Sequence, residues 1–353
     1  MEIWIRGASG RAGRAIAAEL VRRGRRVVLV GRDKQRLLAV VEQAAPGAES
    51  LVLKGDEALA SALAQRAPGV LINTAGPFSG TGTTARECLR HGVHYVDLAN
   101  ELDPVMALLS LDRQAREAGC VLVTGAGFGV AATEAVVLAV RGEHGPAAAA
   151  RVAAMPFVDG VGPAVVASVI NAMAGGGRRY VDGRIERCRL GEGFARTPLP
   201  DGSWVATFAV PTGELEAARR ASGASNVIAA SNELPSGRVV RAMLPLVGRV
   251  LAISPVRRGV LAAVSRSRPR PPRPSTGDTS WAHAELIWPD GTRRQGWLST
   301  GEAYTFTARV AVEVTCALAD GHGRPGAHTP GTLAGVGLIE LAGAKVTIGD
   351  EVR

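Results

Sequence analysis

Three glycines near the N-terminus have the spacing of a turn that holds a dinucleotide. Gly7, Gly10 and Gly13 follow a short apolar segment and precede a segment of helical composition. In a strand–turn–helix unit the first glycine permits a tight turn, the second lets backbone amides approach a pyrophosphate, and the third lets helix and strand pack closely. We therefore expect a dinucleotide to bind here. The residues assigned to this turn are Gly7, Ser9, Gly10, Arg11, Ala12 and Gly13.

The end of the second predicted strand indicates which dinucleotide binds. An acidic residue there would accept hydrogen bonds from the free ribose of NAD, whereas an arginine suits the 2′-phosphate of NADP. The sequence has Arg32, which Arg11 or Lys34 can assist through charge-assisted hydrogen bonds. The next residue, Asp33, is an alternative ribose ligand, although it also fits the N-cap of a helix. The sequence favours NADP(H).

Two further loops carry suitable side chains, because ligands of open α/β sheets lie beyond the carboxyl ends of the strands. The first loop has small residues against which a cofactor can lie and a proline that stiffens it. Its residues are Asn73, Thr74, Ala75, Gly76, Pro77 and Phe78. The second loop places Tyr95, Asp97 and Glu101 where a nicotinamide is expected. Tyr95 is the candidate proton donor, with Asp97 and Glu101 as supporting carboxylates; alternatively, these residues form only a hydrogen-bonded rim.

The elements around these residues alternate as in a doubly wound sheet. Six short apolar strands, from residues 2–6 to 120–124, alternate with helical segments, which predicts parallel pairing. After Gly129 strand-like and helical segments mix, with a hairpin turn at Pro289-Asp290-Gly291. The predicted α/β fold has three parts: a Rossmann dinucleotide-binding domain (1–128), an inserted α+β substrate or dimerisation domain with an antiparallel sheet (129–299), and a C-terminal helical segment (300–353) that returns to the Rossmann domain.

Composition excludes several classes of protein. The 353 residues carry a net charge of +9, but the cations spread along the chain, whereas nucleic-acid binding needs them clustered. No export signal or membrane-spanning segment is visible, which favours a cytoplasmic protein without an integral membrane segment. Four cysteines without a close pair suit reduced thiols and argue against a metal site. A homodimer paired through the second domain is a further expectation.

These motifs resemble those of the saccharopine dehydrogenase-like reductases. The likeness rests on residues 7–13, 30–32, 73–78, 92–98 with Glu101, and 125–129, and it returns weakly at 300–304 with 307–308 and at 328–330. The resemblance implies an NAD(P)-binding Rossmann domain with a substrate domain inserted before a C-terminal return. Lysine-pathway members carry an aspartate and a nearby proline after the position of Phe128, where this chain has Gly129-Val130-Ala131-Ala132. Saccharopine is therefore not the expected substrate.

The shorter members of that family resemble trans-acting enoyl reductases and imine-reducing proteins, which suggests a reaction. We expect an NADPH-dependent reductase that transfers hydride to a polarised C=N or enoyl C=C bond of a largely apolar, biosynthetic intermediate of secondary or lipid metabolism, either free or carrier-bound. The apolar stretches 242–247 and 250–256, and the scarcity of charge in 161–175, fit an apolar pocket, although they fit core helices equally.

Two alternatives stay open. A Rossmann fold does not imply catalysis, so a non-catalytic NADP(H)-binding sensor or scaffold is the competing function. The proline–arginine loop at residues 266–273 either steers an acidic carrier protein toward the site or is a solvated connection.

Overall fold

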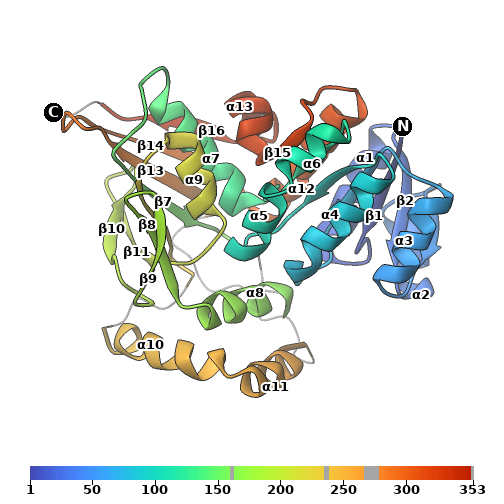
Figure 1. Cartoon of the computed structure of the whole chain (residues 1–353), viewed down its shortest axis with the longest axis horizontal. Helices are drawn as coiled ribbons and strands as arrows, with labels where there is room; N and C mark the ends of the chain where they lie inside the picture. The colour runs from blue at the N-terminus through green and yellow to red at the C-terminus, as the bar shows by residue number, and fades with distance from the viewer. Residues whose placement is uncertain (160–162, 234–237, 266–277, 351–353) are drawn as a thin grey trace. The chain divides into compact units, whose positions relative to one another are not determined.

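The chain divides into two compact units, each built from several separate segments (Figure 1). The computed structural model describes residues 1–159, 163–233, 238–265 and 278–350. Unit 1 comprises Met1–Ala99, Asp103–Gly127 and Tyr304–Ala342, and unit 2 comprises Asn100–Leu102, Phe128–Ala303 and the chain from Gly343 on. The last strand therefore belongs to unit 2, whereas the sequence had placed the whole of 300–353 with the Rossmann domain. The proline–arginine loop at 266–273 lies outside the described residues.

Unit 1 contains, among the described residues, one parallel sheet of seven strands in the order β15-β6-β5-β4-β1-β2-β3. The strands are β1 (Glu2–Arg6), β2 (Arg26–Gly31), β3 (Glu49–Val52), β4 (Val70–Asn73), β5 (His94–Asp97), β6 (Val121–Val123) and β15 (Gly326–His328). The order of the first six is that of a Rossmann sheet, so the predicted fold of this unit is confirmed. The prediction missed β15, because its three residues lie in a glycine-rich stretch that reads as a loop.

Helices that precede or follow these strands along the chain complete unit 1. They are α1 (Arg11–Arg22), α2 (Lys34–Gln43), α3 (Asp56–Gln65), the 3₁₀ turn η1 (Phe78–Gly80), α4 (Thr81–Arg90), α5 (Leu102–Leu109), α6 (Asp112–Glu117), α12 (Ala303–Ala319) and α13 (Pro330–Leu341). α5 and α6 are separate helices, with Ser110 and Leu111 between them. α1 packs on β1 and β2, α4 on β5, and α6 on β6 and β15. The core between them includes Trp4, Leu71 and Tyr95, which have no exposed surface.

Unit 2 is built on a nine-stranded sheet with the main order β10-β11-β12-β7-β13-β14-β16, and β8 joins β9 to β12. Its strands are β7 (Ala149–Met155), β8 (Gly177–Val181), β9 (Arg184–Cys188), β10 (Ala195–Pro198), β11 (Trp204–Ala209), β12 (Asn226–Ser231), β13 (Ser280–Ile287), β14 (Arg293–Thr300) and β16 (Lys345–Ile348). The predicted hairpin at 289–291 joins β13 and β14. The sheet is mixed rather than wholly antiparallel, because β7 and β12 pair in parallel through a long crossover connection.

Helix α7 (Phe128–Arg141) packs against β13 and β14, with α9 (Glu214–Ser222) beside it. Small residues allow this close approach: a Cβ built at Gly296 on β14 would come within 2.6 Å of Cγ2 of Val140 and 3.3 Å of Cγ1 of Val136. The remaining helices, α8 (Pro163–Ala174), α10 (Arg238–Ala252) and α11 (Ser254–Ser265), pack on one another and form the group labelled together in Figure 1. No helix among the described residues has the length and apolar character needed to cross a bilayer.

The contact at Gly296 gives a test of this packing. We expect Gly296→Ala to lower the stability of unit 2 by about 1–3 kcal/mol, because the added methyl overpacks a closely fitted helix–sheet contact. The midpoint of urea unfolding, followed by tryptophan fluorescence, measures the change. Gly145→Ala is the matched control, since a Cβ there meets nothing within 4 Å. Equal midpoints for the two variants would show that the contact has room to relax.

Candidate functional site

The glycine turn after β1 is shaped by contacts that only glycine permits. Gly7 has a φ of +83°, in the left-handed region, and its amide donates to the carbonyl oxygen of Val30 at 2.9 Å. A Cβ at Gly13 would lie 2.5 Å from the carbonyl oxygen of Gly7 and 2.8 Å from Cα of Ala8. The turn is therefore held directly against the first turn of α1, as the sequence predicted for a dinucleotide-binding loop.

The N-terminus of α1 presents backbone amides at this turn. Gly10 is the N-cap residue, and a glycine has no side chain that could accept from the first amides of the helix. Ser9 and Ala12 are half-buried, and Gly10 and Arg11 are exposed. A helix N-terminus of this kind favours the negative charge of a pyrophosphate.

Arg11 has an aromatic neighbour that the sequence analysis did not identify. Its guanidinium carbon lies 4.2 Å from the centre of the Tyr304 ring, within unit 1. A cation over an aromatic face is attracted to it, so Tyr304 fixes the position of the Arg11 side chain beside the helix N-terminus. Tyr304 belongs to the 300–304 motif, but nothing in the sequence alone pairs it with Arg11.

Arg32 directly follows β2 and is exposed. Within the described residues its guanidinium has no carboxylate or hydrogen-bond partner, so it can bind a phosphate without first breaking an ion pair. Asp33 is engaged locally: it is the N-cap of α2, accepts a hydrogen bond from the Arg36 amide at 3.1 Å and pairs with the Arg36 side chain at 3.7 Å. These contacts favour Arg32 over Asp33 as the ligand for the adenosine ribose.

The loop after β4 lies against the glycine turn. Oγ1 of Thr74 would be 2.8 Å from a Cβ at either Gly7 or Gly13, and it donates to the carbonyl oxygen of Arg6 at 2.9 Å. Asn73 shapes the loop, since its Oδ1 accepts from the Ala75 amide at 3.2 Å. The remaining residues predicted to contact the cofactor leave the loop open to solvent: Ala75 and Phe78 are half-buried, and Gly76 and Pro77, joined by a cis peptide bond, are exposed.

Tyr95 and Asp97 lie inside unit 1 and have no exposed surface. The Tyr95 hydroxyl accepts from Nδ2 of Asn73 at 3.1 Å, and burial raises the pKa of Tyr95 well above its usual value. Oδ1 of Asp97 accepts from Oγ1 of Thr124 at 2.7 Å and from the Ala99 amide at 3.0 Å, while burial raises the pKa of Asp97 to about 6. Their burial follows from their place on a strand covered on both faces, and it favours positioning roles for both.

Glu101 belongs to unit 2, in the short segment Asn100–Leu102 that follows the β5 loop. It forms an isolated antiparallel bridge with Thr212, and the Gly213 amide donates to the carbonyl oxygen of Asn100 at 2.8 Å. This segment therefore fixes the start of α9. The sequence placed Glu101 beside Tyr95 and Asp97 because they are close along the chain, whereas the structure assigns them to different units.

The start of α9 carries a buried carboxyl group that sequence reasoning missed. The Glu214 side chain is 3% exposed, and within the described structure its Oε2 has no hydrogen-bond partner. A Cβ at Gly129, in the first turn of α7, would overlap Oε1 of Glu214 and Oδ1 of Asn100. Burial raises the pKa of Glu214 to about 7. A carboxyl group with this pKa can hold and release a proton near neutral pH.

Glu216, two residues further on, shows how strongly the surroundings decide this property. It is equally buried, which by itself would raise its pKa, but hydrogen bonds from Arg219, Tyr180 and Arg220 lower the pKa to about 2. Glu216 is a permanently charged structural anchor, whereas Glu214 can exchange a proton. No sequence signal separates the two glutamates, because the partners that distinguish them come from elsewhere in the fold.

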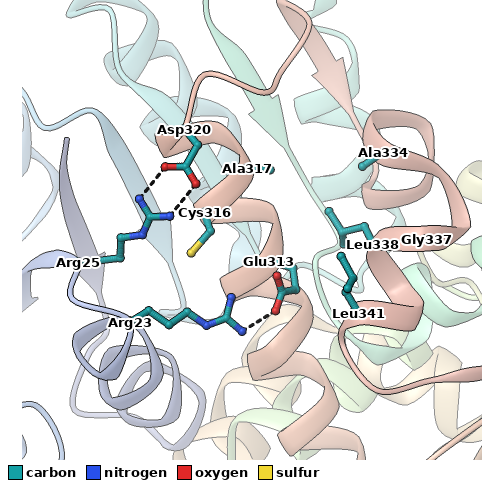
Figure 2. A pocket seen from close by; sticks show the side chains of 10 residues that line it. All are labelled: Arg23, Arg25, Glu313, Cys316, Ala317, Asp320, Ala334, Gly337, Leu338 and Leu341. Carbon is teal, nitrogen blue, oxygen red and sulfur yellow. Dashed lines mark hydrogen bonds and ion pairs between the residues drawn. The ribbon is translucent and has the colours of Figure 1, made fainter.

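A hollow of about 540 Å³ in unit 1 is a separate feature (Figure 2). Arg23 donates a hydrogen bond to Glu313 at 2.5 Å, and Arg25 donates to both carboxylate oxygens of Asp320 at 2.6 Å. Both arginines that line the hollow are therefore already neutralised by carboxylates. Arg23 ends α1, whose 12 residues span about 18 Å from the glycine turn. The hollow is therefore not part of the predicted dinucleotide site.

Comparison with known proteins agrees with this geometry. Residues 3–123 match the family model of the saccharopine dehydrogenase NADP binding domain. The fold resembles that of apo saccharopine dehydrogenase (L-Glu forming) from Saccharomyces cerevisiae, with a TM-score of 0.60 and 14% sequence identity over 99% of this chain and 100% of that one. A probable dehydrogenase from Thermotoga maritima gives a TM-score of 0.47 at 10% identity, over 97% and 94% of the two chains. No curated protein matches the chain by sequence.

The unpaired Arg32 leads to a prediction about cofactor choice. We expect Arg32→Ala to weaken NADPH binding roughly 10- to 100-fold and to leave NADH binding nearly unchanged, because only the 2′-phosphate loses a charge-assisted bond. Titration with each dinucleotide, followed by nicotinamide fluorescence, measures both affinities. Arg36→Ala, in the first turn of α2 and already paired with Asp33, is the control. A parallel loss of NADPH and NADH binding would remove Arg32 from the role of phosphate ligand.

Proposed function

We propose that the chain, whose residues 3–123 match the saccharopine dehydrogenase NADP binding domain, is an NADPH-dependent reductase of an apolar C=N or enoyl C=C substrate. The observation that carries the proposal is the presence in one chain of two parts: a glycine turn with an unpaired arginine at the end of β2, and a buried carboxyl group whose pKa is near neutral. The first part binds NADPH, and the second supplies a proton.

The residues of unit 1 fit a bound NADPH. The amides at the start of α1 would hold the pyrophosphate, Arg32 the 2′-phosphate, and the small residues of the loop after β4 would lie along the cofactor. Arg11, held by Tyr304, adds a positive charge beside the pyrophosphate. When bound, NADPH supplies a hydride equivalent, which adds to the electrophilic carbon of the double bond.

Reduction also requires a proton, which must come from an acid. We assign Glu214 as the donor: its protonated Oε2 gives a proton to the imine nitrogen, or to the carbon adjacent to the carbonyl of an enoyl substrate, and the glutamate is left ionised until solvent reprotonates it. Support comes from its burial, its unpartnered Oε2 and its pKa of about 7. Asn100 lies beside Glu214 within unit 2, since a Cβ at Gly129 would meet both side chains.

An apolar substrate fits the composition of unit 2. The segment of α8 is aliphatic and carries no charged residue. The chain lacks the aspartate and proline that lysine-pathway members carry after the position of Phe128, which argues against saccharopine as substrate. A sensor or scaffold would have no use for a proton-exchanging buried acid, so Glu214 favours catalysis over that alternative. Oxidation of NADPH with panels of cyclic imines and enoyl thioesters tests the proposal, and no turnover with either panel would contradict it.

Glu214 gives a pH prediction. The donor must be protonated, so reductase turnover should be high below pH 7 and fall as the pH rises through about 7. Glu214→Gln should lower kcat about 10²-fold or more, abolish this pH dependence and leave NADPH affinity unchanged. The comparison is Glu216→Gln, which should lower the unfolding midpoint yet keep the pH profile. Retention of the wild-type profile in Glu214→Gln would assign the proton to another group.

Tyr95 gives a second prediction. Tyr95→Phe removes the acceptor for Nδ2 of Asn73 and frees that side chain, whose other end holds the Ala75 amide. We expect turnover to fall several-fold without weaker NADPH binding, because the loop after β4 loses its fixed shape. Asn73→Ala should reproduce the effect, and the two changes should not be additive. Unchanged turnover in Tyr95→Phe would remove Tyr95 from the mechanism.

A further inference from the structure

Helix α10 carries a row of exposed aliphatic side chains along one face. Met243, Leu246, Val247 and Val250 of α10, and Ile253 directly after it, are between 38% and 54% exposed. Their spacing of three and four residues places them on one side of the helix. This row has no cover in the described structure, although large apolar side chains normally avoid water in such numbers.

The opposite side of α10 already has its partners. Leu244 and Leu251 are buried, and a Cβ at Gly248 would meet Leu190 and the carbonyl oxygen of Met173 in α8. α10 therefore uses one apolar face for the core of unit 2 and keeps a second apolar face outside. The exposed row does not belong to the core of unit 2, because other residues of α10 make the buried contact.

Helix α11 continues the exposed face with Val256 and Val260, which are 38% and 36% exposed. Arg257 and Arg258 lie beside them on the same helix, and Arg258 is exposed, as is Arg249 at the end of α10. We call the exposed apolar side chains of 243–260, with Arg249, Arg257 and Arg258, the α10–α11 face.

The charge of this region is of one sign. α10 and α11 contain five arginines, at positions 238, 241, 249, 257 and 258, and no acidic residue occurs between Glu233 and Asp278. Elsewhere the exposed arginines commonly pair with carboxylates, as Arg66 pairs with Glu49. An apolar face flanked only by arginines complements a surface that is itself apolar and anionic.

We propose that the α10–α11 face binds the surface of an anionic lipid membrane. The aliphatic side chains would enter the boundary between headgroups and acyl chains while the arginines contact lipid phosphates, so that the helix pair lies in the plane of the surface. A second copy of the chain is a poorer occupant, because a two-fold contact would bring the arginines of one copy against those of the other. A protein partner is also less suited, since the two helices contain no aromatic residue to serve as an anchor.

The binding test uses the full chain and lipid vesicles. The protein should float with vesicles of phosphatidylcholine mixed with phosphatidylglycerol, bind weakly to phosphatidylcholine alone, and release as salt is raised. The double variant Leu246→Gln and Val250→Gln should lower the partition coefficient at least about tenfold. Arg249→Gln with Arg258→Gln should weaken binding to the anionic vesicles alone. The control is Leu341→Gln on α13, where the side chain is 76% exposed but lies outside the face.

NADPH affinity and the thermal unfolding midpoint report whether each variant is folded. Failure of the wild-type protein to float with anionic vesicles would overturn the proposal, as would equal flotation of the Leu246→Gln, Val250→Gln variant. A halved molecular mass in that variant, measured by light scattering, would show instead that a second copy covers the face. The test is independent of the reductase activity, so the two proposals can fail separately.

Discussion

The absence of side chains at Gly7 and Gly13 is the steric constraint on which unit 1 depends. Because neither residue has a Cβ, the turn after β1, the first turn of α1 and Thr74 of the loop after β4 occupy a space that any larger residue would fill. This contact sets the direction of α1 and hence the direction in which the backbone amides at its N-terminus point. It also fixes where the loop after β4 begins. The positions of the predicted cofactor ligands therefore depend on the lack of a Cβ at Gly7 and Gly13.

Three of the buried carboxyl groups in the described residues differ in their hydrogen-bond donors. Oδ1 of Asp97 accepts from Thr124 and from the Ala99 amide, Glu216 is held charged by two arginines and a tyrosine, and Glu214 meets no charged donor, while Asp97 and Glu214 each keep one oxygen without a partner. Burial raises the pKa of all three, and the hydrogen-bond donors that each meets decide the outcome. The pKa of each of these buried acids therefore follows from the donors around it rather than from burial alone.

The sequence predicted the features that local rules determine. The glycine turn, the alternation of strands and helices up to Val123, the Asp33 cap and the β13–β14 hairpin all depend on residues close together in the chain. β15 was missed because three residues in a glycine-rich stretch give no periodic signal, and the parallel β7–β12 pair because pairing partners are far apart in sequence. Glu214 could not be found, since its surroundings come from 100–102, α7 and α9 together. The roles of Tyr95, Asp97 and Glu101 stay proposals.

The seventh strand of unit 1 has a consequence for how the chain acquires its fold. β15 comes from residues 326–328 yet pairs with β6 at 121–123, and α12 and α13 also belong to this unit. During synthesis on the ribosome, the Rossmann sheet therefore has an open edge beside β6 until residues 326–328 have emerged. Unit 2 apart from its last strand, β16, is made in the meantime, while the exposed β6 edge is available for wrong pairing with other nascent chains. Completion of unit 1 therefore waits for residues that are far from its glycine turn in the sequence.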